Sequence, residues 1–156
     1  MVLWFVGLSW LLVYAVFQSP ALDYRVVALG SVVPLADAVT GGAWVLHALV
    51  SSVAALVIVM LLTRRRRLAR RRWLGIPIGM FVHLVLDGVW TNSHVFWWPF
   101  FGLSFAGEQL PETSRGVLVI AMELAGVGAI VYGYRRFGFD DVVVRRRFIA
   151  TGQLPR

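Results

Sequence analysis

Long apolar stretches alternate with polar segments along the whole chain. Four of them, at about residues 2–19, 43–62, 73–92 and 116–134, approach the twenty or so apolar residues that cross a bilayer as a helix. A shorter apolar stretch, at about 24–39, contains a proline and an aspartate, so we expect a re-entrant or interfacial helix there. The pattern predicts an all-α fold in a single domain: an integral membrane bundle of about four transmembrane helices plus this extra helix.

Composition supports the membrane class. The 156 residues are 59% hydrophobic and 15% charged, whereas a soluble domain has about 25% charged residues. All fifteen basic residues are arginines, and the net charge is +7. Seven arginines lie in Arg64–Arg72 between two apolar stretches. We therefore expect this run to contact anionic lipid headgroups and expect no nucleic acid partner. The chain has no cysteine, which excludes disulfides and thiolate chemistry.

The arginines also predict an orientation. The basic loop 63–72 and the tail 135–156 hold thirteen of the fifteen, so both are expected on the cytoplasmic side of the inner membrane. With the 24–39 helix re-entrant, both termini are then cytoplasmic. The connections 20–42 and 91–115 face outward, and the aromatic residues of the second suit a membrane interface.

His83 and Asp87 are the most informative polar residues. Spaced four apart on a predicted helix, they lie on one face, one turn apart. Ionisable groups at bilayer depth are costly to bury and are commonly functional. Such a pair can hold a metal ion, or it can hydrogen-bond between helices and serve structure alone.

The other buried acids and histidines are expected in the middle or outer half of the membrane under this orientation. They are Asp37, His47 and Glu123, with His94 in the outward connection. Their convergence predicts one polar site that opens outward. Histidines with carboxylates suit zinc, manganese or iron. The alternatives are a loop role for His94 and a protonated, hydrogen-bonded Glu123.

The segment GIPIGMFVHLVLDGVWTNSHVFWWPFFG resembles the membrane-bound metal-dependent hydrolase family, the inner-membrane hydrolases of the YdjM type. The residues that carry the resemblance are Gly79, His83, Leu84, Leu86, Asp87, Trp98, Pro99 and Phe100, preceded by Pro34, Asp37 and His47. The resemblance covers about residues 24–102. The family's ligand pattern is similar to that of zinc-dependent phospholipase C.

The resemblance implies that Asp37, His47, His83 and Asp87 hold a divalent metal, with zinc as the first choice, and that Glu123 or His94 moves protons. The chain departs from the family where Leu35 replaces an aspartate, so a single-metal site is an alternative to a dinuclear one. The implied function is metal-dependent hydrolysis of a lipid or lipid-linked phosphoester by a metal-activated water. The alternative is a non-enzymatic membrane protein that binds metal, relays protons or assists transport.

Overall fold

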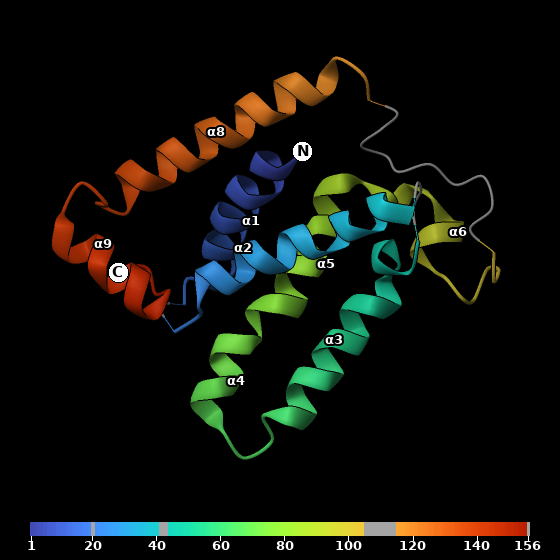
Figure 1. Ribbon diagram of the computed structural model, residues 1–156, viewed down its shortest axis with the longest axis horizontal. Helices are drawn as coiled ribbons and strands as arrows, with labels where there is room; N and C mark the ends of the chain where they lie inside the picture. The colour runs from blue at the N-terminus through green and yellow to red at the C-terminus, as the bar shows by residue number, and fades with distance from the viewer. Residues whose placement is uncertain (20, 41–43, 105–114, 156) are drawn as a thin grey trace.

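The computed structural model describes residues 1–19, 21–40, 44–104 and 115–155 (Figure 1). These residues form helices and no strand, which confirms the predicted all-α fold. The α-helices are α1 (Val2–Phe17), α2 (Tyr24–Val32), α3 (Leu49–Leu62), α4 (Arg67–Trp73), α5 (Gly75–Asp87), α6 (Ser93–Phe96), α8 (Leu118–Arg136) and α9 (Val142–Thr151). The 3-10 helices are η1 (Val33–Thr40), η2 (Val45–His47) and η3 (Val89–Thr91).

The four predicted spans correspond to α1, α3, α5 and α8. Among the described residues, only α8 is long and apolar enough to cross a membrane, and α1 and α3 are shorter apolar helices. Only 17% of the most apolar part of α8 is buried among the described residues. The four-span bundle stays a prediction. Part of the predicted outer connection, 105–114, lies outside the described residues.

Local sequence explains several helix ends. α1 ends at Gln18 in the left-handed conformation, with φ 45°. α2 begins at Asp23, whose carboxylate accepts a hydrogen bond of 3.1 Å from the Arg25 backbone N–H, as an N-cap residue does. α5 ends where Gly88 adopts φ 73°, a conformation that glycine takes without steric cost.

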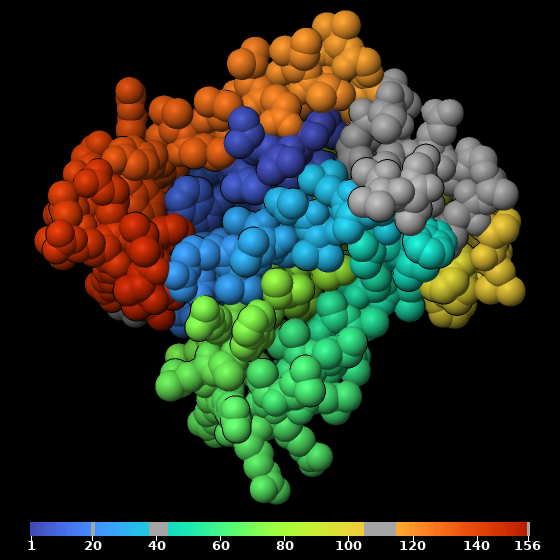
Figure 2. Space-filling view, viewed as in Figure 1, coloured from blue at the N-terminus to red at the C-terminus, as the bar shows by residue number. Residues whose placement is uncertain are grey.

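The arginine run is more ordered than the predicted loop 63–72. It contains α4, which pairs with α3 in a helical hairpin that projects from the molecule in Figure 2. Arg70 Nη2 donates to the carbonyl oxygens of Thr63 and Arg64, at 3.3 and 2.9 Å. These bonds close the turn between the two helices. The predicted tail 135–156 likewise contains α9.

Glycines bring α2 and α5 into backbone contact. A Cβ atom at Gly79 would lie 2.7 Å from the Ser31 backbone nitrogen and would overlap the Val27 carbonyl. A Cβ atom at Gly30 would lie 2.9 Å from the Ile76 Cα atom. Small residues allow this approach, which is frequent between membrane helices. Gly75 lies against Val26 and Val27 near the start of α2, and Gly79 lies against Ser31 near its end. α2 and α5 therefore run parallel.

α1 packs on α8 in the same way. A side chain at Gly126 would overlap the backbone of Leu3, and one at Gly7 would meet the Gly126 carbonyl. Nearer the other end of α1, Leu11 lies beside Gly133. α1 and α8 therefore also run parallel, and α8 covers α1 along its length (Figure 1).

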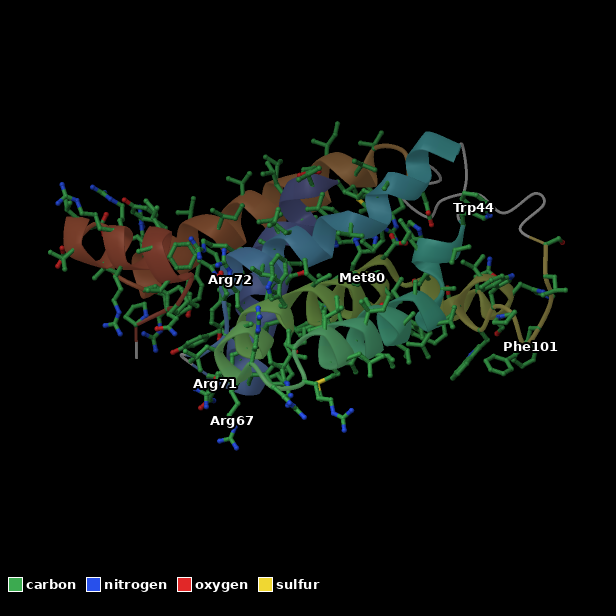
Figure 3. The ribbon with its side chains drawn as sticks, turned by 60° about the horizontal axis from the view of Figure 1, so that its bottom comes forward. Trp44, Arg67, Arg71, Arg72, Met80 and Phe101 are labelled. Atoms are coloured by element: carbon green, nitrogen blue, oxygen red, sulfur yellow. The ribbon has the colours of Figure 1, made fainter. Side chains whose placement is uncertain are left out.

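The start of α2 lies at the arginine end of the molecule. Asp23 Oδ2 is 3.5 Å from Arg72 Nε, and the Tyr24 backbone N–H donates to the Gly152 carbonyl beyond α9, at 2.8 Å. Figure 3 shows Arg67, Arg71 and Arg72 at one end and Trp44 and Phe101 at the other. The residues that open the connection 20–42, which is predicted to face outward, therefore lie beside the arginines. The orientation in a membrane stays a prediction.

The segment 24–39 runs from the arginine end of the bundle toward the metal centre, and its re-entrant or interfacial position in a membrane stays a prediction. It leaves the arginine end as α2, continues as η1 and reaches Asp37 beside His47, from which α3 returns to the arginine run. The nine residues of α2 and eight of η1 span about 30 Å, because a 3-10 helix rises about 2.0 Å per residue against about 1.5 Å for an α-helix. The predicted helix at 24–39 is therefore an α-helix continued by a 3-10 helix.

The packing of α1 on α8 also fixes the position of the N-terminus. α1 starts at the end remote from the arginines and finishes near Asp23, beside them, whereas α9 lies at the arginine end. Met1 therefore lies beside Glu123 near the start of α8, whereas α9 lies beside the start of α2. The expectation that both termini are cytoplasmic stays a prediction.

Candidate metal centre

Three of the four predicted metal ligands meet inside the helix bundle. His47 comes from η2, and His83 and Asp87 come from α5. Their candidate ligand atoms all lie within 4.8 Å of one another, and each of the three residues is fully buried. The imidazole rings meet edge to face, with centroids 5.3 Å apart. The predicted convergence of these three residues is confirmed.

The positions of the three residues along the chain explain why their side chains come together. His83 and Asp87 are four residues apart on α5, so both point to one face. His47 reaches the same face because it ends the short helix η2, which immediately precedes α3. α3 packs against α5, and the site therefore joins the start of one helix to the last turn of another.

His83 is held in one tautomer by α2. Its Nδ1 lies 2.7 Å from the carbonyl oxygen of Ser31. A carbonyl oxygen only accepts hydrogen bonds, so Nδ1 carries the proton, and in the neutral ring the lone pair is on Nε2. A backbone carbonyl at the distal nitrogen is a usual partner of a histidine that binds metal. The glycine-mediated contact of α2 with α5 places this carbonyl.

Asp37 holds His47 in the corresponding way. Asp37 Oδ2 lies 2.9 Å from His47 Nδ1 and accepts backbone N–H bonds from Trp44 and His47, at 3.1 Å each. The carboxylate is 3% exposed. This carboxylate oxygen accepts hydrogen bonds, so His47 Nδ1 donates to it and Nε2 of the neutral ring carries the lone pair. Asp37, predicted as a direct ligand, thus lies behind His47 and outside the group of three.

Arg115 is a residue of the site that the sequence reading missed. Its Nη1 lies 2.9 Å from Asp87 Oδ1, and its Nη2 donates to the Asp87 carbonyl. The Arg115 side chain is 20% exposed. The sequence does set Arg115 apart, because Arg25 and Arg115 are the two arginines outside the clusters at 64–72 and 135–156.

Phe5 is the second missed residue. Its ring stacks on the His83 imidazole, with centroids 3.8 Å apart and an interplanar angle of 25°. It is fully buried and covers the ring from the α1 side. No pattern in the sequence distinguishes Phe5 from the other aromatic residues of α1.

The two predicted proton-transfer residues lie elsewhere. Glu123 Oε1 is 3.2 Å from the Met1 ammonium, and Oε2 accepts the Leu3 N–H at 2.9 Å. Glu123 thus binds the N-terminus of α1, the helix that carries Phe5. His94 is exposed on α6, where its backbone N–H donates to Asn92. The structure brings neither residue into the buried group.

The donor set can hold a metal ion. Two imidazole nitrogens and one carboxylate oxygen are the three protein ligands typical of a catalytic zinc site, which keeps its fourth position for water or substrate. Donors on a tetrahedral zinc lie about 3.3 Å apart, so the three donors, which lie within 4.8 Å of one another, would have to move closer to hold the ion. Iron and manganese accept the same donors.

No family model, curated protein or solved structure matches this chain.

Proposed function

We propose that the chain is an integral membrane protein in which His47, His83 and Asp87 bind one divalent metal ion and hydrolyse a phosphoester of a lipid or lipid-linked substrate. The observation that carries the proposal is the buried group of three donors, in which the distal nitrogen of each histidine is already hydrogen-bonded. Buried imidazoles and carboxylates oriented in this way are typical of metal centres. The phosphoester class rests on the resemblance to the metal-dependent hydrolase family.

The distribution of apolar side chains supports a membrane location. Large apolar residues are exposed all along α3 and α8, and the space-filling view shows α8 on the outside of the molecule (Figure 2). On α3 they are Val53, Leu56, Val57, Ile58, Met60, Leu61 and Leu62. Soluble monomers rarely expose apolar patches of this extent. The interior holds His47, His83 and Asp87 together with a core of apolar side chains.

Each residue of the centre has a role in the proposal. The Nε2 atoms of His47 and His83 and a carboxylate oxygen of Asp87 hold the metal, and Asp37 and the Ser31 carbonyl fix the two rings. When bound, zinc supplies a water whose pKa falls toward about 7 and polarises a phosphoryl oxygen. Zinc is the first choice for this donor set, with manganese or iron as alternatives.

The position of Arg115 supports the proposal that the substrate is an anion. Its guanidinium neutralises Asp87, and its partial exposure lets it contact a group that enters the site. Guanidinium groups bind phosphate oxygens in a bidentate manner. A carboxylate has two oxygens, so Arg115 at Oδ1 is compatible with a metal at Asp87. Glu123 positions α1 in this account, and an acid–base role for His94 remains a prediction.

A second candidate function is non-enzymatic. The complete burial of His47, His83 and Asp87 also suits a closed structural metal site, or a proton-relaying group that assists transport. The non-enzymatic candidate predicts the same metal ligands without an open coordination position. Turnover separates the two candidates.

The test uses the full chain purified in a mild detergent. A nitrophenyl phosphodiester and a fluorescent phospholipid are assayed with wild type, His83→Ala and Asp87→Ala, and His94→Ala is the matched histidine control. The proposal predicts metal-dependent turnover that falls at least about a hundredfold in the two ligand variants and is retained in the control. Bound metal without turnover would favour the non-enzymatic candidate, and turnover that survives His83→Ala would contradict the proposed centre.

A further inference from the structure

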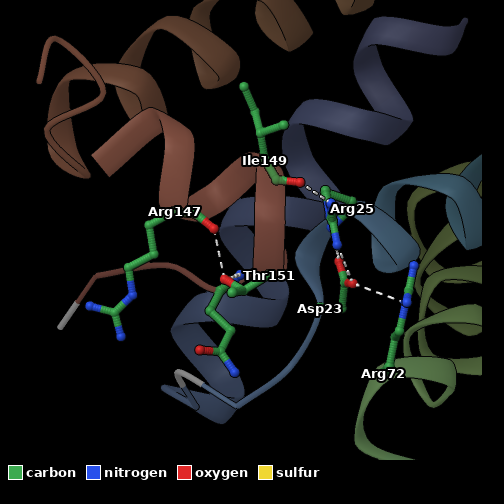
Figure 4. A network of polar contacts seen from close by, with 7 residues as sticks. Asp23, Arg25, Arg72, Arg147, Ile149 and Thr151 are labelled. Atoms are coloured by element: carbon green, nitrogen blue, oxygen red, sulfur yellow. Dashed lines mark hydrogen bonds and ion pairs between the residues drawn. The ribbon is translucent and has the colours of Figure 1, made fainter. Parts of the chain in front are cut away.

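A polar cleft lies at the arginine end of the molecule, remote from the metal centre. Its volume is about 280 Å³, and its walls come from the α1–α2 connection, α4 and the C-terminal end of α9. The lining residues are Ala21, Asp23, Arg25, Leu68, Arg71, Arg72, Ala150, Thr151 and Gln153. Figure 4 shows part of its polar network.

The cleft carries excess positive charge around one buried acid. Three arginines line it with a single carboxylate, that of Asp23, which is 3% exposed. Asp23 Oδ2 lies 2.8 Å from Arg25 Nη2 and 3.5 Å from Arg72 Nε. One carboxylate therefore holds two guanidinium groups in place, and Arg71 adds a third positive charge.

The α9 wall is fixed to the same residues. Arg25 Nη1 donates to the Ile149 carbonyl (Figure 4). The Tyr24 N–H donates to the Gly152 carbonyl at 2.8 Å. Gly152 has φ 69°, and any side chain there would overlap the Asp23 carboxylate. Specific contacts between distant parts of the chain therefore form the cleft and fix the position of its walls.

We propose that this cleft binds a phosphate-type anion, with Arg71 and Arg72 as its main donors. Guanidinium groups match phosphate oxygens in geometry and charge, and the volume accommodates one headgroup phosphate. The anion can belong to an acidic membrane lipid, since basic clusters beside membrane helices attract such headgroups, or it can be a soluble phosphate. This inference is independent of the proposed hydrolase activity.

The experiment measures binding to the full chain in dodecyl maltoside, with phosphatidylglycerol as one probe and inorganic phosphate as the other. The cleft variants are Arg71→Gln and Arg72→Gln, and Arg67→Gln is the control on the same helix outside the cleft. Each cleft variant should weaken binding about fivefold, the effect of about 1 kcal/mol per arginine, and the control should match wild type. Arg71→Gln leaves the Asp23 ion pairs intact, so it tests the cleft even if Arg72→Gln unfolds.

Either probe can support the proposal. Phosphatidylglycerol binding that inorganic phosphate does not displace assigns the cleft to lipid, and binding of phosphate alone assigns it to a soluble anion. Equal losses in Arg67→Gln and Arg71→Gln would overturn the proposal, because they would indicate a diffuse charged surface. Failure of both probes to bind would overturn it as well.

Discussion

Asp37 Oδ2 lies 2.9 Å from His47 Nδ1 and also accepts the His47 backbone N–H, so one carboxylate oxygen fixes both the ring and the backbone of this residue. This relationship places Asp37 behind the metal ligand His47. Groups in that position orient a ligand and raise its basicity.

Asp37→Asn should weaken metal binding about 10–100-fold while the metal stoichiometry at saturating metal is retained. The reason is that the substitution removes the charge behind His47 but no ligand atom. Competition with a chromogenic chelator measures the affinity. Asp140→Asn, which changes an exposed acid, is the control.

If Asp37 were instead a direct ligand, its asparagine variant would lose metal as completely as His47→Ala. Equal losses in these two variants would contradict the positioning role.

Gly79→Ala should destabilise the protein by about 1–3 kcal/mol, the usual range for overpacking. A methyl group at this position would push α5 away from Ser31 and Val27. Because the Ser31 carbonyl holds His83, metal affinity should fall as well. Thermal unfolding in detergent, with and without metal, measures both effects.

Gly128→Ala is the matched control, since a Cβ atom there meets nothing within 4 Å. It should be neutral or slightly stabilising, because alanine favours a helix over glycine by about 1 kcal/mol. Equal behaviour of the two variants would show that α2 and α5 do not pack as closely as described.

Asp23 should make the free energy of unfolding depend on pH in the acidic range. Burial raises the pKa of Asp23, but the hydrogen bond and charge of Arg25, with two backbone N–H groups, outweigh it and hold the pKa below its ordinary value of 3.8. The folded state therefore favours the ionised form. The resulting stability is present above the unfolded-state pKa and is lost as the pH falls through the lower, folded-state pKa.

Asp23→Asn should accordingly lower the melting temperature near pH 7 and flatten its decline below about pH 4. Asp140→Asn should keep the wild-type profile. A wild-type acid profile in Asp23→Asn would mean that the Asp23–Arg25 pair adds nothing to stability.

The arrangement of helices predicts that the N-terminus and the arginine clusters lie on opposite sides of a membrane. Reporter tags fused before Met1 and after Arg156 should therefore report different compartments, and a tag inserted near Arg65 should agree with the C-terminal one. Both ends on one side would contradict the proposed membrane arrangement, in which α1, the α2–η1 segment, α3, α5 and α8 would each cross the bilayer.

The sequence predicted the helical class and the pairing of His83 with Asp87, because apolar runs and a spacing of four residues depend only on local geometry. It also predicted that His47 joins them. It did not predict the α2–α5 contact, although Gly75 and Gly79 are spaced as in a packing motif. Which helix fills such a groove depends on tertiary structure.

Arg115 and Phe5 illustrate a second limit. Each contacts the centre from an element far away in the chain, and no local pattern marks such a contact. Glu123 is the converse case, since a lone acid in an apolar helix suggested catalysis but binds the N-terminus of α1.

Metal content and coordination of the purified full chain test the central claim most directly. Elemental analysis with X-ray absorption should find about one divalent ion per chain, with imidazole nitrogen at about 2.0–2.1 Å, and no ion in His83→Ala or Asp87→Ala. Wild-type protein that stays metal-free after growth and incubation with zinc, manganese and iron would contradict the account, as would an ion retained in both variants.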